Sequence, residues 1–263
     1  MAKKNKISVM GLKKKKKAKL ESPKVFTLFP RKHLIQRAVS AAESAEKQPQ
    51  GRDPLAGKKN NAESWGTGHA MSRVPRIKGS GFPTARNAGF IPGVVGGRVA
   101  HPPRSEKRTV KKINKKEREL ALLNAISATA KRDLVEKRGH KIGQVVSFPL
   151  VLDDKVQTLK KTSQVIDVLS NLGLESETDR VRNGRTIRAG KGKRRGRKYK
   201  SKKGPLFIIK DDFGIHKAAR NIAGVDVVKV DHLNCKNLAP GANIGRLVIW
   251  SQSAFKYLEK YEV

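Results

Sequence analysis

Positive charge is concentrated in three separate segments of this chain, and this distribution constrains the fold more than any other feature of the sequence. Residues 1–20, 47–105 and 180–204 together carry a net charge of +30, out of +37 for all 263 residues. These segments lack the apolar periodicity of helices or strands, whereas the nearly neutral segments between them have it. Because unpaired cations are rarely buried, the sequence predicts a nearly neutral globular body that carries basic arms and loops.

The neutral segments alternate between helix and strand patterns. Apolar residues recur at spacings of three and four over 30–46, 114–138 and 163–173, which predicts helices. Over 114–138 the predicted buried face consists of Leu120, Leu123, Ser127, Ala130 and Leu134. Two shorter helices are predicted at 215–222 and 254–261, and strands are predicted at 145–152, 206–209, 225–230 and 246–250. This alternation predicts an α/β fold with a mostly parallel sheet flanked by helices.

Segment 47–105 interrupts the alternation of helix and strand patterns, and we predict that it forms a separate internal loop. It holds ten of the 23 glycines, seven of the 12 prolines and ten basic residues, opposed only by Asp53 and Glu63. A loop of this length in a compact domain is typical of either function or disorder. Its spaced apolar residues are rare in pure linkers, and they include Trp65, Phe82 and Phe90. We therefore expect the loop to be disordered when free and ordered on a partner.

Segment 180–204 contains thirteen basic residues and no acid. Its glycines fit the spacing of neither the dinucleotide fingerprint nor the phosphate-binding P-loop. Such a segment suits neutralisation of nucleic-acid phosphates, with glycines allowing close approach of the backbone. The alternative is a solvated charged loop. The lysine run at 13–17 is compatible with either a nucleic-acid arm or a nuclear localisation patch.

The sequence contains no convincing catalytic, metal or cofactor site. The pairs Asp153–Asp154 and Asp211–Asp212 follow predicted strands, where a metal site is conceivable, but adjacent aspartates there are more often turn and cap residues. The six histidines show no ligand spacing, and the single cysteine, Cys235, excludes an internal disulfide and fits a reducing compartment. No apolar stretch reaches the roughly 18 residues that a membrane-spanning helix needs.

Six ordered motifs carry a resemblance to a known family. They are GRDPLAG at 51–57, ESWGTG at 63–68, RVPRIKG at 73–79, GGRVAHPP at 96–103, INKKE at 113–117 and IRAGKGKRRGR at 187–197. Together they resemble large-subunit ribosomal protein four in its archaeal and eukaryotic form. The sequence departs from the family pattern at two places. His69 stands where the pattern leads us to expect an arginine, and the lysine-rich stretch 13–17 interrupts what the resemblance implies to be the first strand, at 7–10, and its turn.

The resemblance implies a Rossmann-like globular domain, formed by 21–46 and 106–263, and a basic N-terminal segment at 1–20. It also implies that the loop at 47–105 extends through ribosomal RNA (rRNA) to the peptide exit tunnel. The implied partners are large-subunit rRNA, neighbouring ribosomal proteins and, near the loop tip, the nascent polypeptide. We expect a cytoplasmic protein of the large subunit that is neither a homo-oligomer nor an enzyme and has no cofactor.

The residues expected to bind rRNA are basic, apart from one tryptophan, and lie in the two internal basic segments. They are Arg52, Lys58, Trp65, Arg73, Arg76, Lys78, Arg86, Arg98, Arg104, Arg185, Arg188, Lys191, Lys193, Arg194, Arg195, Arg197 and Lys198. The residues expected at the loop tip, beside the tunnel, are Arg73, Arg76, Lys78, Phe82, Arg86 and Phe90.

Two other classes of protein are weighed against a ribosomal one. A DNA-compacting basic protein needs charged arms but no irregular, partly apolar loop of 59 residues. A nucleic-acid-modifying α/β enzyme, such as a methyltransferase or nuclease, needs a cofactor fingerprint or a convergent acidic site, and the sequence offers neither.

Overall fold

The structure is a computed structural model that describes residues 6–13, 16–145 and 147–261. The chain forms two compact units. We call Met1–Glu43 with Lys111–Val263 the globular unit, and Ser44–Val110 the loop unit. The predicted loop at 47–105 falls inside the loop unit. Of the lysine run at 13–17, Lys14 and Lys15 lie outside the described residues.

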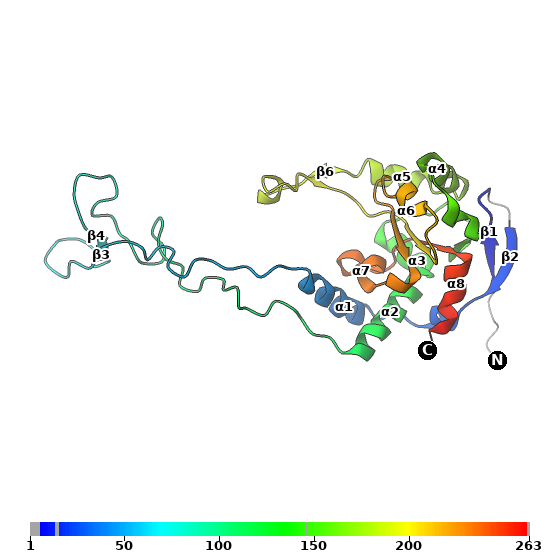
Figure 1. Ribbon diagram of the computed structural model, residues 1–263, viewed down its shortest axis with the longest axis horizontal. Helices are drawn as coiled ribbons and strands as arrows, with labels where there is room; N and C mark the ends of the chain where they lie inside the picture. Colours follow the sequence, from blue (N-terminus) through cyan, green and yellow to red (C-terminus); the bar gives the residue numbers. More distant parts are fainter. Residues whose placement is uncertain (1–5, 14–15, 146, 262–263) are drawn as a thin grey trace. The chain divides into compact units, whose positions relative to one another are not determined.

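A six-stranded sheet forms the centre of the globular unit (Figure 1). Its strands are β1 (Lys6–Met10), β2 (Lys16–Glu21), β5 (Leu150–Leu152), β8 (Leu206–Ile209), β9 (Asp226–Lys229) and β10 (Val248–Ser251). The order is β2-β1-β5-β10-β8-β9, and only β1 and β2 pair antiparallel. The prediction of a mostly parallel sheet is confirmed. The strand order differs from the 3-2-1-4-5-6 order of a dinucleotide-binding sheet, so the likeness to a Rossmann fold is limited to the architecture.

Both faces of the sheet are covered, as its short apolar strands require. Alternate side chains of β8 enter different clusters: Leu206 and Ile208 pack on one face, and Phe207 and Ile209 on the other. The same alternation holds in β10, where Trp250 joins the first cluster. The strands therefore read as continuous apolar runs because each successive side chain is buried on the opposite side.

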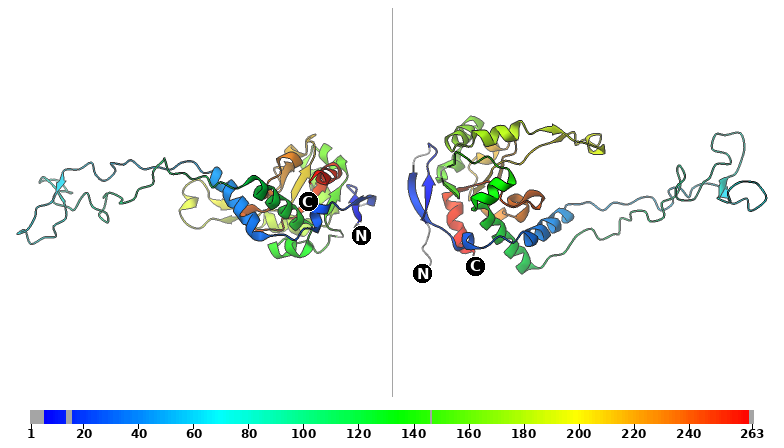
Figure 2. Two further views of the ribbon diagram at one scale, coloured as in Figure 1. Left: turned by 90° about the horizontal axis from the view of Figure 1, so that it is seen from below. Right: turned by 180° about the vertical axis from the view of Figure 1, so that it is seen from behind.

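Helices from distant parts of the chain cover the two faces (Figure 2). The first face is covered by α1 (Lys32–Ala45), α2 (Lys115–Thr129), α7 (Cys235–Leu238) and α8 (Gln252–Tyr257). The second face is covered by α3 (Arg132–Arg138), α4 (Thr162–Asn171) and α6 (Ile215–Ala219). The longest helix in the described ranges has fifteen residues, and no helix there combines the length and apolarity needed to cross a membrane.

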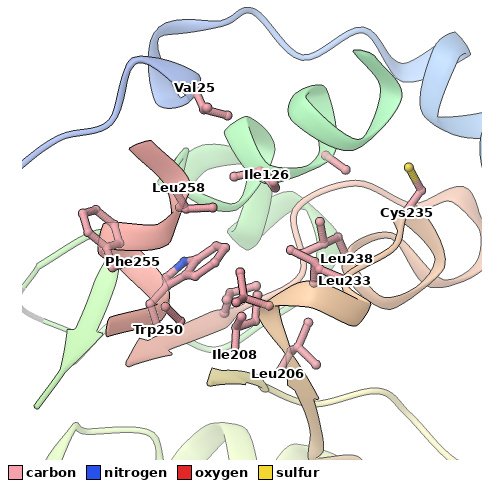
Figure 3. Close-up of a cluster of buried hydrophobic side chains, with 14 of the residues drawn as sticks. Val25, Ile126, Leu206, Ile208, Leu233, Cys235, Leu238, Trp250, Phe255 and Leu258 are labelled. Carbon is pink, nitrogen blue, oxygen red and sulfur yellow. The ribbon is translucent and has the colours of Figure 1, made fainter. Parts of the chain in front are cut away.

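Trp250 is at the centre of the first cluster (Figure 3). Its ring meets that of Phe255 edge to face, with 6.3 Å between centroids, and Phe26 stacks on Phe255 at 5.7 Å. Because aromatic rings bury large apolar areas, these contacts tie β10 and α8 to the chain before α1.

The predicted helix over 114–138 is wrong in its continuity, and its predicted buried face is only partly right: Ser127 is buried and Leu123 packs against the first cluster, but Leu120 is exposed. The chain forms two helices, α2 and α3, with a break at Ala130 and Lys131. Gly139 ends α3 as predicted, and it does so in the left-handed conformation that glycine adopts readily. Leu120 is 39% exposed, whereas the small residues Ala121 and Ala125 are buried. Alanines allow the closest approach of the helix to its neighbours, and that packing decides the face.

The N-terminal segment 1–20 is not merely a basic extension, because β1 is part of the central sheet. Ile7, Val9 and Met10 are buried there, while all but one of the residues of β2 are exposed. A lysine-rich edge strand keeps its charges in water and discourages pairing with other strands. The predicted strand at 145–152 is shortened to β5, since Pro149 lacks the N–H that a ladder needs.

The loop unit is held by turns and one short antiparallel pair, β3 (Ala62–Glu63) with β4 (Arg76–Ile77). Within 44–110 only Ser44 and Gly89 are buried. The loop unit therefore has no hydrophobic core of its own.

Candidate nucleic-acid interface

The first basic surface is a hairpin at 184–203, which we call the basic hairpin. Strand β6 (Thr186–Ile187) pairs antiparallel with β7 (Tyr199–Lys200), and the turn between them contains a 3₁₀ segment, Lys191–Lys193. The N–H of Arg188 donates to the carbonyl of Lys198 at 2.8 Å. Since Ile187 and Tyr199 are themselves exposed, backbone hydrogen bonds rather than a core define this hairpin.

Two arginines in the basic hairpin stabilise it as well as adding charge. The guanidinium of Arg185 lies 3.9 Å from the ring centre of Tyr199, and Nε of Arg188 donates to the carbonyl of Arg197 at 3.1 Å. The remaining predicted contacts are exposed and have no carboxylate partner in the described part of the chain; they are Lys191, Lys193, Arg194, Arg195, Arg197 and Lys198. The structure thus groups at one turn six cations that have no carboxylate partner in the described ranges, although Nζ of Lys198 also lies 5.6 Å from the ring centre of Tyr199.

Helix α5 (Glu175–Arg182) leads into the basic hairpin, and the sequence reasoning missed it because the boundary at residue 180 divides it. Its first turn carries Glu175 and Glu177, and its last turn Arg180 and Arg182. Acidic residues in the first turn and basic residues in the last turn complement the helix dipole. This order of charges is visible in the sequence and could have indicated the helix.

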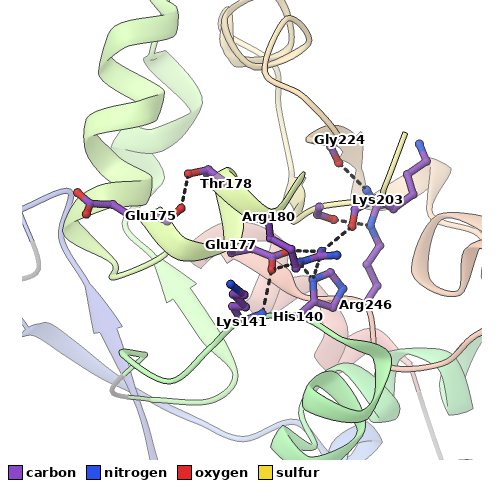
Figure 4. Close-up of polar contacts among 10 residues, drawn as sticks. His140, Lys141, Glu175, Glu177, Thr178, Arg180, Lys203, Gly224 and Arg246 are labelled. Carbon is purple, nitrogen blue, oxygen red and sulfur yellow. Dashed lines mark hydrogen bonds and ion pairs between the residues drawn. The ribbon is translucent and has the colours of Figure 1, made fainter. Parts of the chain in front are cut away.

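Glu177 anchors the base of the basic hairpin through a buried network (Figure 4). Its carboxylate accepts from Nδ1 of His140 at 2.6 Å, from Arg180 at 2.6 and 2.8 Å, and from the N–H of Lys141 at 2.9 Å. Burial alone raises the pKa of Glu177, but these donors outweigh it and lower the pKa to about 2. Arg180 in turn donates to the carbonyl of Lys203 at 3.1 Å, so the network holds the returning strand of the hairpin.

A second anchor is Arg246, which is 1% exposed. It donates to the carbonyls of Gly204 at 3.0 Å and Asn237 at 2.9 Å, and it pairs with Asp226. Burial raises the pKa of Asp226, but Arg246 and Lys203 reverse the effect and lower it. Every described polar atom of the Arg246 guanidinium has a partner, so this cation is structural and is not available to a ligand.

The second basic surface lies in the loop unit. Four of the predicted contacts, Arg52, Lys58, Arg98 and Arg104, line one hollow of about 660 Å³. Gly57 allows the chain to pack closely beside this hollow. Its φ is +81°, and a Cβ at this position would lie only 2.4 Å from the backbone N of Arg98. Asp53 and Glu106 also line the hollow, so its cationic character is partly offset.

The predicted tip residues play different roles in the structure. Arg76 donates to the carbonyl of Arg86 at 3.0 Å and to Oγ of Ser72 at 3.1 Å, so it organises the turn. Lys78 forms an ion pair with Glu63 across β3 and β4. The predicted tip residues that remain exposed without such side-chain partners in the described chain are Arg73, Phe82, Arg86 and Phe90.

Trp65, the one aromatic residue among the predicted contacts, is half-buried. Its ring meets that of His69 edge to face, with 5.5 Å between centroids. The histidine that departs from the family pattern therefore packs on the tryptophan and is itself exposed.

One aspartate of each pair accepts backbone N–H groups, and Asp153 forms an ion pair with Lys17 instead. Oδ1 of Asp212 accepts from the N–H groups of Gly214 and His216, and Oδ1 of Asp154 accepts from the N–H of Ser253 at 2.9 Å. Among the described residues, no three His, Cys, Asp or Glu side chains gather as a metal site requires. Burial raises the pKa of Cys235 to about 11, which leaves its thiol unreactive.

Comparisons with known proteins agree on one family. The model of the ribosomal protein L4/L1 family matches residues 20–261. The chain is 46% identical to "Large ribosomal subunit protein uL4" of Methanosphaera stadtmanae over 253 residues, which is 96% of each chain. Proteins of the same description from Methanopyrus kandleri and Saccharolobus islandicus (strain Y.N.15.51 / Yellowstone #2) are 44% and 45% identical. These two matches cover 92% of this chain, and 93% and 89% of the respective relatives.

Proposed function

Since the chain belongs to the ribosomal protein L4/L1 family, we propose that it binds large-subunit rRNA through the basic hairpin and the loop unit. It is a structural component of the large ribosomal subunit and not an enzyme. Membership of this family also sets aside the DNA-compacting protein and the nucleic-acid-modifying enzyme that composition alone left open.

The observation that carries the proposal is the group of six exposed cations at the turn of the basic hairpin. They have no carboxylate partner among the described residues, and the buried networks of Glu177 and Arg246 hold the hairpin base. A charged turn on a fixed base neutralises phosphates without a large ordering cost, because its position is already set.

The loop unit supplies the second part of the proposal. A segment with almost no buried residues cannot offset an ordering cost of roughly 1–2 kcal/mol per residue, so rRNA acts as its scaffold. We place Arg52, Lys58, Arg98 and Arg104 against phosphates. Following the family resemblance, the tip from 73 to 90 forms part of the exit-tunnel wall and meets the nascent chain.

The salt dependence of rRNA binding tests the role of the hairpin. The variant replaces all six cations by Gln: Lys191, Lys193, Arg194, Arg195, Arg197 and Lys198. If each contacts a phosphate, the slope of log K against log salt decreases in magnitude by about 4–5, at 0.7–0.9 per contact. The matched control replaces six exposed lysines of the globular unit outside the hairpin by Gln: Lys155, Lys160, Lys161, Lys210, Lys217 and Lys256.

The control variant is expected to keep the wild-type slope within about one unit. Equal slopes for the two variants would mean that only the total charge of the protein affects rRNA binding. The basic hairpin would then not be an rRNA-binding site. Circular dichroism of both variants checks that the fold is unchanged.

A further inference from the structure

A second hollow, of about 750 Å³, lies at the base of the basic hairpin, entirely within the globular unit. Helices α1 and α3, the returning strand of the hairpin and residues 243–244 line it. Seven Lys or Arg side chains and His140 contribute to the lining, and no acidic residue does. The hollow is thus more uniformly cationic than the one in the loop unit.

The nearest carboxylates are already committed to other cations. Glu177 accepts from Arg180 and His140, and Asp226 pairs with Arg246 and Lys203. Five lining cations have no carboxylate partner in the described ranges; they are Lys32, Lys137, Arg138, Lys200 and Lys202. Such a cluster of like charges repels itself, and an anion bound in the hollow would relieve that repulsion.

Two buried polar atoms of this lining also lack partners. Nη2 of Arg138 donates to the carbonyl of Pro240 at 3.3 Å, but Nη1 has no acceptor among the described residues. His140 has a side chain only 1% exposed, and its Nε2 is likewise without a partner there. Unsatisfied buried groups are costly, so each points to a ligand group.

The two atoms need opposite kinds of partner. A guanidinium can only donate, so Nη1 of Arg138 requires an acceptor. Nδ1 of His140 faces the ionised carboxylate of Glu177, which can only accept, so this nitrogen carries the proton. Burial lowers the pKa of His140 and keeps the ring neutral. Nε2 is therefore an acceptor and requires a donor.

We propose that this hollow binds one ribose-phosphate unit of an RNA strand, with a phosphate oxygen accepting from Arg138 Nη1 and the 2′-hydroxyl donating to His140 Nε2. DNA has no 2′-hydroxyl, so this site distinguishes the two nucleic acids. The inference rests on the proposed rRNA binding and names a contact that the hairpin turn does not make.

The wall of the hollow is rigid, and its rim can move. Gly245 packs backbone to backbone against α3: a Cβ there would lie 2.4 Å from the carbonyl oxygen of Leu134. Both unpartnered atoms lie beneath the surface, so the nucleotide must displace side chains at the rim. Five lysines of the lining are exposed; Lys203 is held by Asp226, and the other four have no carboxylate partner in the described ranges and can change rotamer.

The test is 2′-deoxy interference mapping on an rRNA fragment that the full-length protein binds. Fragments carry single 2′-deoxy substitutions at random, and binding separates tolerant from intolerant positions. We expect one nucleotide at which the deoxy sugar weakens wild-type binding by about fivefold, as loss of one hydrogen bond does. In His140→Asn the amide still donates to Glu177 but no acceptor remains at the place of Nε2, so the effect at that nucleotide disappears. The control Lys217→Met, an exposed lysine outside the hollow, keeps it.

A second variant allows a decision if His140→Asn does not fold. Arg138→Met is expected to lower the salt slope by about one unit; an unchanged slope overturns the site. Interference at no nucleotide, or interference retained in folded His140→Asn, overturns it as well. Stabilisation of the free protein by uridine monophosphate, with no interference on RNA, would assign the hollow to a free nucleotide. If the wild type binds no rRNA fragment, the proposed function itself fails.

Discussion

Nε of Arg246 donates to the carbonyl oxygen of Gly204 over 3.0 Å, in a site that is closed to solvent. The contact joins the residue two positions before β10 to the residue that ends the 180–204 basic segment. A buried cation therefore fixes where a surface cation cluster emerges from the fold.

Arg246→Met should destabilise the globular unit by about 3 kcal/mol, because it leaves Asp226 and three carbonyls without their buried donor. Lys203→Met removes the other partner of the same carboxylate but from an exposed position, and should cost less than about 1 kcal/mol. Urea unfolding followed by circular dichroism measures both. Equal losses would show that Arg246 is not the anchor described here.

Glu177 should make stability depend on acidic pH. Its pKa is about 2 in the folded protein, against an ordinary value of 4.5, so the unfolded chain takes up the proton first as the pH falls. The contribution, on the order of 3 kcal/mol, is complete above about pH 4.5 and declines toward pH 2. We expect Glu177→Gln to be less stable than the wild type at pH 7 and the difference to shrink at pH 3. A difference that stays constant over this range contradicts the role given to the carboxylate.

Gly245→Ala should cost more than about 3 kcal/mol, because it combines a left-handed φ of +84° with a backbone clash against Leu134. Gly139→Ala is the matched control: its φ is +98°, but no heavy atom lies within 4 Å of the added Cβ. Left-handed strain alone costs about 1–2 kcal/mol. Thermal unfolding of the two variants separates the terms, and similar losses would mean that α3 shifts to relieve the clash.

Limited trypsin digestion should cut the free protein first in the loop unit, at exposed sites such as Arg73, Lys78 and Arg86. The reason is that this unit has almost no buried residues to resist local opening. Mass spectrometry should recover 111–179 and 205–261 largely uncut. In purified large subunits the same bonds should resist cleavage; rapid cutting there would contradict ordering by rRNA.

Reversing the exposed tip charges, with Arg73→Glu and Arg86→Glu together, should leave subunit assembly intact and alter nascent-chain stalling, because the potential near the tip changes sign. Arg76→Glu is the contrasting variant: it removes the hydrogen bonds to Arg86 and Ser72 and should impair assembly. Sucrose-gradient profiles and ribosome profiling measure the two outcomes. Unchanged elongation with the exposed pair reversed removes the tunnel assignment.

The local sequence pattern was sufficient to predict those elements whose structure depends on a single property, either apolarity or charge. Strand β8 runs from Leu206 to Ile209 as predicted, because a short run of four consecutive apolar residues is typical of a strand buried on both faces. The mostly parallel sheet followed from the alternation of such strands with helices. The exposed turn of the basic hairpin followed from composition, since a run of cations without acids cannot be buried.

Other features depend on residues that meet only in the folded chain. The sequence pattern did not predict which face of α2 is buried. Ala121 is buried and the larger Leu120 is exposed, because close packing of the helix against its neighbours favours the small side chain. Glu177 and His140 are 37 positions apart, and Arg246 and Gly204 are 42 apart. In the sequence these residues resemble other charged or polar positions. Tertiary packing decides which of them lose their water, and a buried charge must find its partner wherever the fold brings one.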